Sequence, residues 1–147
     1  MAETDNPAEQ QERVGHLLRL AVQRWTTLWA DHVDAPLTLV QSTVLWELKH
    51  ESPLDQQTLG HRTGLDKSTC GYLVDRLCKR GLLDAGIDPT NRRRKLITLT
   101  PEGRDLVEKT APAAVRVNEE GLAGLSPEER TQLAHLLRRV AHPGTDS

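Results

Sequence analysis

Four consecutive cationic side chains, Arg92 to Lys95, are the densest run of charge in the sequence. They follow residues 88–91, Asp-Pro-Thr-Asn, where proline and asparagine are typical of a tight turn. Guanidinium and ammonium groups donate hydrogen bonds to phosphate and carboxylate oxygens. A turn followed by four such groups therefore indicates a surface that binds a polyanion.

A second polar set opens a predicted helix. Asp66 is a favourable N-cap, and the helix is expected to run to about Arg80 and to stop at Gly81. The N–H groups at a helix start favour phosphate. Its predicted buried stripe consists of Cys70, Leu73, Val74 and Leu77. The candidate contacts with a polyanion are Lys67, Ser68, Thr69, Gly71, Tyr72 and Arg76.

The elements around these two sets form a known arrangement. A short helix is predicted from Asp55 to about Arg62, and Gly64 then supplies a tight turn. Residues 82–87 and 96–99 have the composition of short strands, which makes the cationic run the tip of a β-hairpin. Helix, turn, helix and hairpin in this order predict a winged helix-turn-helix, whose second helix fits the major groove of duplex DNA.

The remainder of the chain is predicted to be helical. Apolar residues recur at helical spacing from about Gln10 to Asp31, and Thr38, Thr100 and Ser126 are candidate N-caps of three further helices. The expected fold class is therefore mainly α, with about six helices and a small β-hairpin wing.

The distribution of charge agrees with binding to DNA, although the net charge of the chain is −2. Residues 54–100 hold nine Lys/Arg and five Asp/Glu, whereas residues 1–53 and 101–147 are each net acidic. DNA binding depends on the local field rather than on the total charge. The predicted helix-turn-helix and hairpin thus coincide with the basic block.

The sequence gives no support for a membrane protein, a secreted protein or an enzyme. The chain has no apolar run of the roughly 18–20 residues that a membrane span needs, and its start lacks the pattern of a signal peptide, so we expect a cytoplasmic protein. The sequence offers no nucleophile–base pairing, metal-ligand spacing or phosphate loop. We therefore expect neither an enzyme nor a bound cofactor or metal.

Taken together, short motifs spread over residues 10–141 resemble the MarR (multiple antibiotic resistance regulator) family in order and spacing. They are Leu37-Thr38 with Gln41 and Leu45; Ser68-Thr69; Val74-Asp75-Arg76-Leu77; Lys79-Arg80-Gly81-Leu82; Asp88-Pro89 with Arg92-Arg93; and Leu99-Thr100-Pro101-Glu102-Gly103. The resemblance implies a homodimer that binds a pseudo-palindromic operator on double-stranded DNA. Such proteins usually repress a promoter, and many release it when a small molecule binds.

The resemblance also implies how the chain is divided. The first helix and the last two form the dimer interface in this family. The expected organisation is a disordered tail (1–9), an N-terminal dimerisation helix (10–36), a winged DNA-binding lobe (37–100), C-terminal dimerisation helices (101–142) and a second tail (143–147).

Individual roles carry over at matching positions. Ser68 and Thr69 match the start of the family's recognition helix, and Arg92 and Arg93 match its wing arginines. Asp88 matches the wing acid that orients one of those arginines. Some positions depart from the pattern: Asn91 replaces a frequent Asp, Tyr72 a frequent polar or basic residue, and Cys78 a frequent Glu. The base preference of the family therefore does not transfer. Arg94 and Lys95 complete the predicted DNA contacts.

An effector site is the third expectation. The family often holds a ligand between the first two helices and the DNA-binding lobe, and this sequence looks closest to the branch that answers aromatic acids. Core packing explains its tryptophans equally well. The candidate pocket residues are His16, Trp25, Trp29, His32, Gln41, Ser42 and Trp46.

An alternative function is a thiol-based redox sensor on the same scaffold. Cys78 lies one position off the buried stripe and Cys70 lies on it, so Cys78 is the more accessible candidate. A thiol sensor needs a thiolate of low pKa, for which the only sequence support is the adjacent Lys79 and Arg80. An inert thiol is the simpler interpretation of Cys70.

Overall fold

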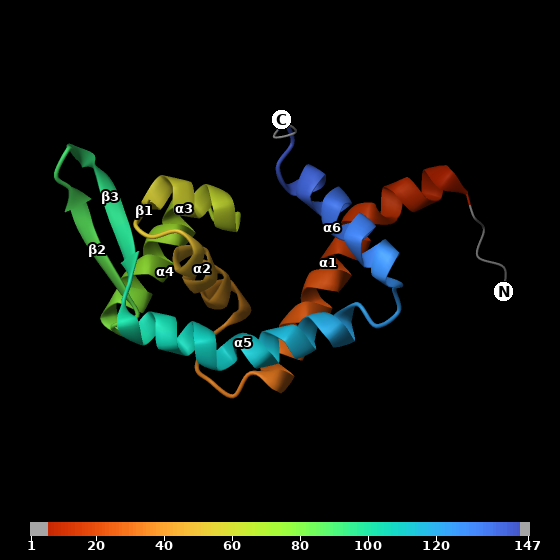
Figure 1. The fold of residues 1–147 in the computed structure, drawn as a ribbon. Coiled ribbons are helices and arrows are strands. Elements are labelled where there is room, and N and C mark those ends of the chain that lie inside the picture. Colours follow the sequence, from red (N-terminus) through yellow and green to blue (C-terminus); the bar gives the residue numbers. More distant parts are fainter. Residues whose placement is uncertain (1–5, 145–147) are drawn as a thin grey trace.

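The computed structural model describes residues 6–144, which form six helices and a three-stranded antiparallel sheet (Figure 1). In chain order the elements are α1 (Pro7–His32), α2 (Leu39–His50), β1 (Leu54–Asp55), α3 (Gln56–Thr63), α4 (Lys67–Lys79), β2 (Leu83–Asp88), β3 (Asn91–Leu99), α5 (Pro101–Gly121) and α6 (Pro127–Ala141). The predicted fold class, six helices with a β wing, is confirmed.

The apolar core of the lobe formed by α2, α3, α4 and the sheet holds the helix-turn-helix in place. Its fully buried side chains come from every one of these elements and include Leu45, Leu48, Leu59, Leu77 and Ile97. Aliphatic side chains fill this core, and burial of each stabilises the fold by about 1.5–3 kcal/mol. Of the predicted stripe on α4, three residues are buried and Leu73 is half-buried.

Local capping sets where the helices begin, as the sequence predicts. Asp66 caps α4 by accepting a hydrogen bond from the Thr69 N–H at 2.8 Å, and Thr38, Thr100 and Ser126 cap their helices in the same way. Asp55, which was predicted as the first residue of the short helix, is instead the N-cap of α3. Gly64 and Gly81 have φ of 68° and 74°, a left-handed conformation that is cheap only for glycine. These two glycines turn the chain at the end of α3 and just beyond α4.

Helix α5 runs along the base of the molecule and joins the winged lobe to α1 and α6 (Figure 1). Trp25 of α1 donates its indole N–H to Asn118 of α5 at 3.1 Å. The Trp25 ring lies so close to Gly121 that a Cβ there would overlap it. Glycine at this position therefore allows α1 and α5 to cross closely. Among the described residues, no helix is long and apolar enough to span a bilayer.

Three sequence expectations need correction. Helix α1 begins at Pro7, capped by Asn6, so residues 7–9 are helical rather than part of a disordered tail, and residues 1–5 and 145–147 lie outside the described part. Strand β3 begins at Asn91 rather than at residue 96, because Asn91 pairs with Asp88 and Lys95 with Ile87 of β2, with a shift in register between the two pairs. Strand β1, which pairs with β3, was missed because two residues carry no periodicity.

Several large apolar side chains of α1 and α6 are exposed in the single chain. They are Val14, Leu17, Leu18, Leu20, Val22, Leu136, Leu137 and Val140. Exposed apolar surface on two neighbouring elements typically marks a protein–protein contact. This distribution is consistent with the predicted dimerisation helices.

Candidate nucleic-acid interface

Helix α4 presents a polar face opposite its buried stripe. With 3.6 residues per turn, Ser68, Tyr72 and Lys79 lie on the side away from Cys70 and Val74. The three side chains are exposed, whereas Cys70 and Val74 are buried. The predicted start of the recognition helix is therefore open to solvent along Lys67, Ser68 and Thr69.

Two predicted contact residues on this face touch each other. The Arg76 Nη1 donates to the Tyr72 hydroxyl oxygen at 2.9 Å, and the Arg76 guanidinium carbon lies 5.5 Å from the centre of the Tyr72 ring. Gly71, in contrast, faces α3: a Cβ there would lie 3.3 Å from the Gln56 Nε2. Gly71 therefore leaves room for the amide of the Gln56 side chain, a role that the sequence alone did not reveal.

The wing is braced at its turn and at its base. Asp88 is buried, and its Oδ1 accepts hydrogen bonds from the Thr90 hydroxyl at 2.7 Å and the Thr90 N–H at 2.9 Å. Arg94 lies between two acids, with Nη2 3.0 Å from Asp55 Oδ2 and Nη1 3.6 Å from Asp88 Oδ2. Asp55 also caps α3. Arg94 thus ties the wing to the first helix of the helix-turn-helix.

This geometry corrects the role expected of Asp88. The family resemblance implied that Asp88 orients Arg92 or Arg93, but its ion-pair partner is Arg94. The reason is the position of Asp55 on β1, which pairs with β3 and draws the Arg94 guanidinium to the base of the wing. Arg92 and Arg93 are exposed, and among residues 6–144 neither makes an ion pair. They remain available to an anionic partner.

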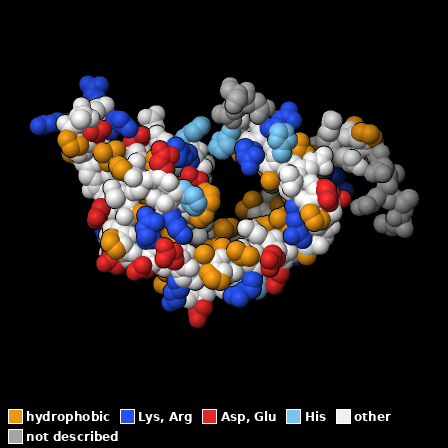
Figure 2. Space-filling model, in the orientation of Figure 1, with side chains coloured by type: hydrophobic (Ala, Val, Ile, Leu, Met, Phe, Trp, Pro, Cys, Tyr) orange, Lys and Arg blue, Asp and Glu red, His pale blue; other side chains and the backbone are white. Residues whose placement is uncertain are grey.

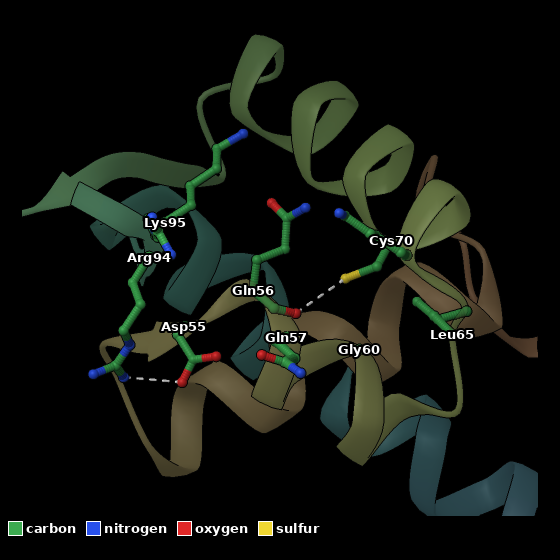
Figure 3. A pocket seen from close by; sticks show the side chains of 10 residues that line it. Asp55, Gln56, Gln57, Gly60, Leu65, Cys70, Arg94 and Lys95 are labelled. Carbon is green, nitrogen blue, oxygen red and sulfur yellow. Dashed lines mark hydrogen bonds and ion pairs between the residues drawn. The ribbon is translucent and has the colours of Figure 1, made fainter. Parts of the chain in front are cut away.

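A cleft separates the wing from the start of α4 (Figure 3). Figure 3 shows Arg94 turned toward Asp55 and Lys95 pointing to the other side, where Lys95 Nζ lies 3.3 Å from Asp75 of α4. The floor is formed by Gln56, Gly60 and Cys70, and the rim carries Lys67 and Arg93. Figure 2 shows Lys and Arg side chains gathered at the wing tip. The cleft thus has a cationic rim that fits the backbone of a nucleic acid.

Comparison with known proteins decides the family. The MarR family model matches residues 35–94. The HTH-type transcriptional repressor NicR of Pseudomonas putida is 35% identical over 141 residues, covering 95% of this chain and 89% of the repressor. The chain belongs to the MarR family. It is a DNA-binding transcription regulator with the winged helix architecture that this family shares.

Solved structures of MarR-family proteins agree with this assignment. The PcaV regulator of Streptomyces coelicolor, solved with its natural ligand, is 40% identical with a TM-score of 0.83, and the match covers 96% of this chain and 97% of PcaV. Bordetella bronchiseptica BpsR, whose DNA binding is regulated by 6-hydroxynicotinic acid, is 37% identical with a TM-score of 0.80, covering 88% and 99%.

Most of the predicted effector-pocket residues of this MarR-family chain have structural partners within one protomer. Trp29 is buried and donates its indole N–H to the Leu37 carbonyl at 2.7 Å. His32 Nε2 lies 2.9 Å from Glu120 Oε1, and Gln41 completes the capping box of α2. Trp46 is 51% exposed.

His16 is exposed and Ser42 is half-buried. Two members of the set contact α5, Trp25 through Asn118 and His32 through Glu120. None of the seven residues lines the cleft beside the wing. Their assignment to an effector site remains a prediction.

Both cysteines are poorly suited to thiol sensing. Cys70 is buried and Cys78 is half-buried, and burial raises the pKa of both thiols. A raised pKa lowers the fraction of thiolate at neutral pH, and the thiolate is the form that reacts with oxidants. The ordering of exposure predicted for the two cysteines is confirmed.

Three capping or turn carboxylates make stability depend on acid pH. The hydrogen bonds of Thr58 lower the pKa of Asp55, those of Thr69 lower the pKa of Asp66, and those of Thr90 lower the pKa of Asp88. The folded state therefore binds fewer protons than the unfolded state, whose Asp pKa is about 3.9. The contribution of these three carboxylates to the free energy of unfolding is fully present above that value. It is lost as the pH falls through their lower folded-state pKa values.

We expect Tm to fall between pH 6 and pH 3, as circular dichroism melts can measure. Asp66→Asn is the matched control because asparagine caps a helix about as well as aspartate but does not titrate in this range. Its Tm should fall less than that of the wild type over the same interval. Equal falls in both proteins would show that the Asp66 cap does not carry the effect.

Proposed function

We propose that this protein is a homodimeric transcription repressor. It binds operator DNA with α4 in the major groove and with the wing along the adjacent sugar–phosphate backbone. The observation that carries the proposal is an exposed polar face on α4 together with two exposed arginines on the wing, Arg92 and Arg93. Arg93 and Lys67 of α4 line the cationic cleft between the two elements. Repression is supported by NicR, the 35% identical relative, which is a transcriptional repressor.

The dimer rests on the exposed apolar side chains of α1 and α6. Burial of apolar surface is the dominant favourable term in most protein association, and a dimer would cover these side chains. A two-fold symmetric dimer then requires a pseudo-palindromic operator with half-sites about one helical turn apart. The protein acts by binding, without catalysis, and in the cytoplasm, where its operator lies.

The chemical class of the proposed effector is inferred from the ligand of a related regulator. BpsR is regulated by 6-hydroxynicotinic acid, a hydroxylated aromatic carboxylic acid. By analogy, a hydroxylated aromatic carboxylate releases this repressor from its operator. The indoles and imidazoles on α1 and α2, Trp25, Trp46, His16 and His32, offer ring surfaces and donors that suit such a ligand.

The decisive experiment is a titration of the purified protein against the DNA upstream of its own gene, followed by fluorescence anisotropy. We expect binding that weakens by orders of magnitude between 50 and 200 mM salt, because several phosphate contacts release counterions. A random duplex of equal length should bind much more weakly. Equal affinity for both duplexes would contradict the proposal.

The effector is tested on the same complex. Addition of 6-hydroxynicotinic acid or hydroxybenzoic acids should release the DNA and raise Tm of the free protein, because a ligand that binds only the folded state stabilises it. Cyclohexanecarboxylic acid, which keeps the carboxylate but lacks the aromatic ring, is the matched control. Release by the control alone, or by none of the acids, would exclude an aromatic carboxylate effector.

A further inference from the structure

The side chain at the centre of the exposed face of α4 is the only tyrosine of the chain, Tyr72. It is 59% exposed and lies one helical turn after Ser68. The buried residues Cys70, Val74 and Leu77 lie on the opposite side of the helix. When α4 enters a major groove with that face, Tyr72 therefore faces the base edges, and the phosphates lie to either side.

Tyr72 is held by Arg76, which lies one turn further along α4. The Arg76 Nη1 donates to the Tyr72 hydroxyl oxygen at 2.9 Å, and the guanidinium carbon lies 5.5 Å from the centre of the Tyr72 ring. Residues at i and i+4 on a helix are neighbours, so this contact forms without any other element. This contact favours one arrangement of the two side chains before DNA arrives, which lowers the entropy lost on binding.

The hydrogen bond also decides which groups the pair offers to a partner. The Tyr72 oxygen accepts from Arg76, so its own O–H points to another acceptor. Arg76 has five N–H donors, of which one is used here. The pair therefore presents almost only donors to the groove.

Among base edges in the major groove, guanine best matches a set of donors. Its N7 and O6 are both acceptors, whereas adenine and cytosine each present an amino donor and thymine presents one acceptor beside a methyl group. We propose that Tyr72 and Arg76 act together as the guanine reader of each operator half-site. This inference rests on the proposed binding of α4 in the major groove.

A test with modified operators isolates the base contact. The operator is first selected from random duplexes with the wild-type protein, and each guanine of a half-site is then replaced by 7-deazaguanine, which pairs normally but lacks the N7 acceptor. At one guanine per half-site, we expect the replacement to lower wild-type affinity by roughly fivefold or more. No sensitivity at any guanine would overturn the inference.

The variant Tyr72→Phe keeps the ring and removes the hydroxyl group. We expect it to bind the selected operator roughly fivefold more weakly than wild type and to be less sensitive to 7-deazaguanine, with the remaining sensitivity due to the donors of Arg76. Its affinity for random duplex and its salt dependence should stay unchanged, because phosphate contacts are retained. If operator and random duplex weaken equally, Tyr72 contacts phosphate and the inference is wrong.

A spectroscopic test uses the fact that the chain has one tyrosine. With ¹³C-labelled tyrosine, the single Cζ resonance should shift when the selected operator binds, and the shift should change with 7-deazaguanine. A resonance that does not respond to the operator would overturn the inference while leaving DNA binding intact. Absence of any sequence preference would instead overturn the proposed function together with the guanine reader.

Discussion

Replacing both Arg92 and Arg93 by alanine is expected to weaken operator binding at least tenfold at 150 mM salt. Both side chains are exposed, and no ion pair of the described residues occupies them. A dimer would lose four cations. If each contacts one phosphate, the slope of log K against log salt becomes shallower by about 3.6, since each contact contributes about 0.9. Anisotropy titrations at four salt concentrations measure both quantities.

The matched control for this variant removes two arginines elsewhere. Arg104 and Arg116 are exposed on α5, outside the wing, so the double variant Arg104→Ala/Arg116→Ala has the same net charge. We expect its operator affinity to change much less. Arg94 is avoided because its ion pairs with Asp55 and Asp88 brace the wing. Equal losses in the two double variants would mean that total charge, not the wing, determines affinity.

The largest expected loss of stability comes from Gly103→Ala. A Cβ at this position would overlap the carbonyl oxygen of Leu82 and lie 2.7 Å from the Leu99 Cδ1. The Leu82 carbonyl already accepts from the Thr100 N–H at 3.2 Å, and the Thr100 side chain caps α5. Because the clash involves backbone, it cannot be relieved by a rotamer change, and α5 must move away from the lobe.

We expect Gly103→Ala to lower the free energy of unfolding by about 3 kcal/mol, as overpacking and a weakened helix cap combine. For a chain of this size that corresponds to a Tm lower by roughly 6–12 °C. Gly86→Ala is the control, since a Cβ there meets nothing within 4 Å. Melts at equal protein concentration separate the two, and a Gly103→Ala variant as stable as Gly86→Ala would contradict the close approach.

Local sequence signals predicted most of the fold. The caps Thr38, Asp66 and Ser126 lie where the sequence indicates, because each accepts a hydrogen bond from a residue three positions later. The turn at Gly64 and the stop at Gly81 follow from a conformation that only glycine adopts cheaply. These features depend on neighbours within one turn, so the sequence alone is sufficient.

Part of the candidate site could be predicted from the sequence and part could not. The cationic residues Arg92 and Arg93 and the polar start of α4 could be named from composition and spacing, and their exposure agrees. The contacts of Asp88 with Arg94 and of Gly71 with Gln56 could not be predicted from the sequence. They depend on which strand and which helix lie alongside, and no local sequence pattern specifies these neighbours.

By itself, then, the sequence determined the order of helices, the capped recognition helix and the arginine-bearing hairpin. Only the tertiary structure decided that Arg94 is a brace rather than a free cation, because Asp55 reaches it through the pairing of β1 with β3, 39 residues apart along the chain. Tertiary structure likewise left Arg92 and Arg93 without acidic partners in the described chain. Contacts between distant segments form only when the core packs. They therefore decide which of three chemically equivalent arginines of the wing is paired with acids, a difference that the sequence does not show.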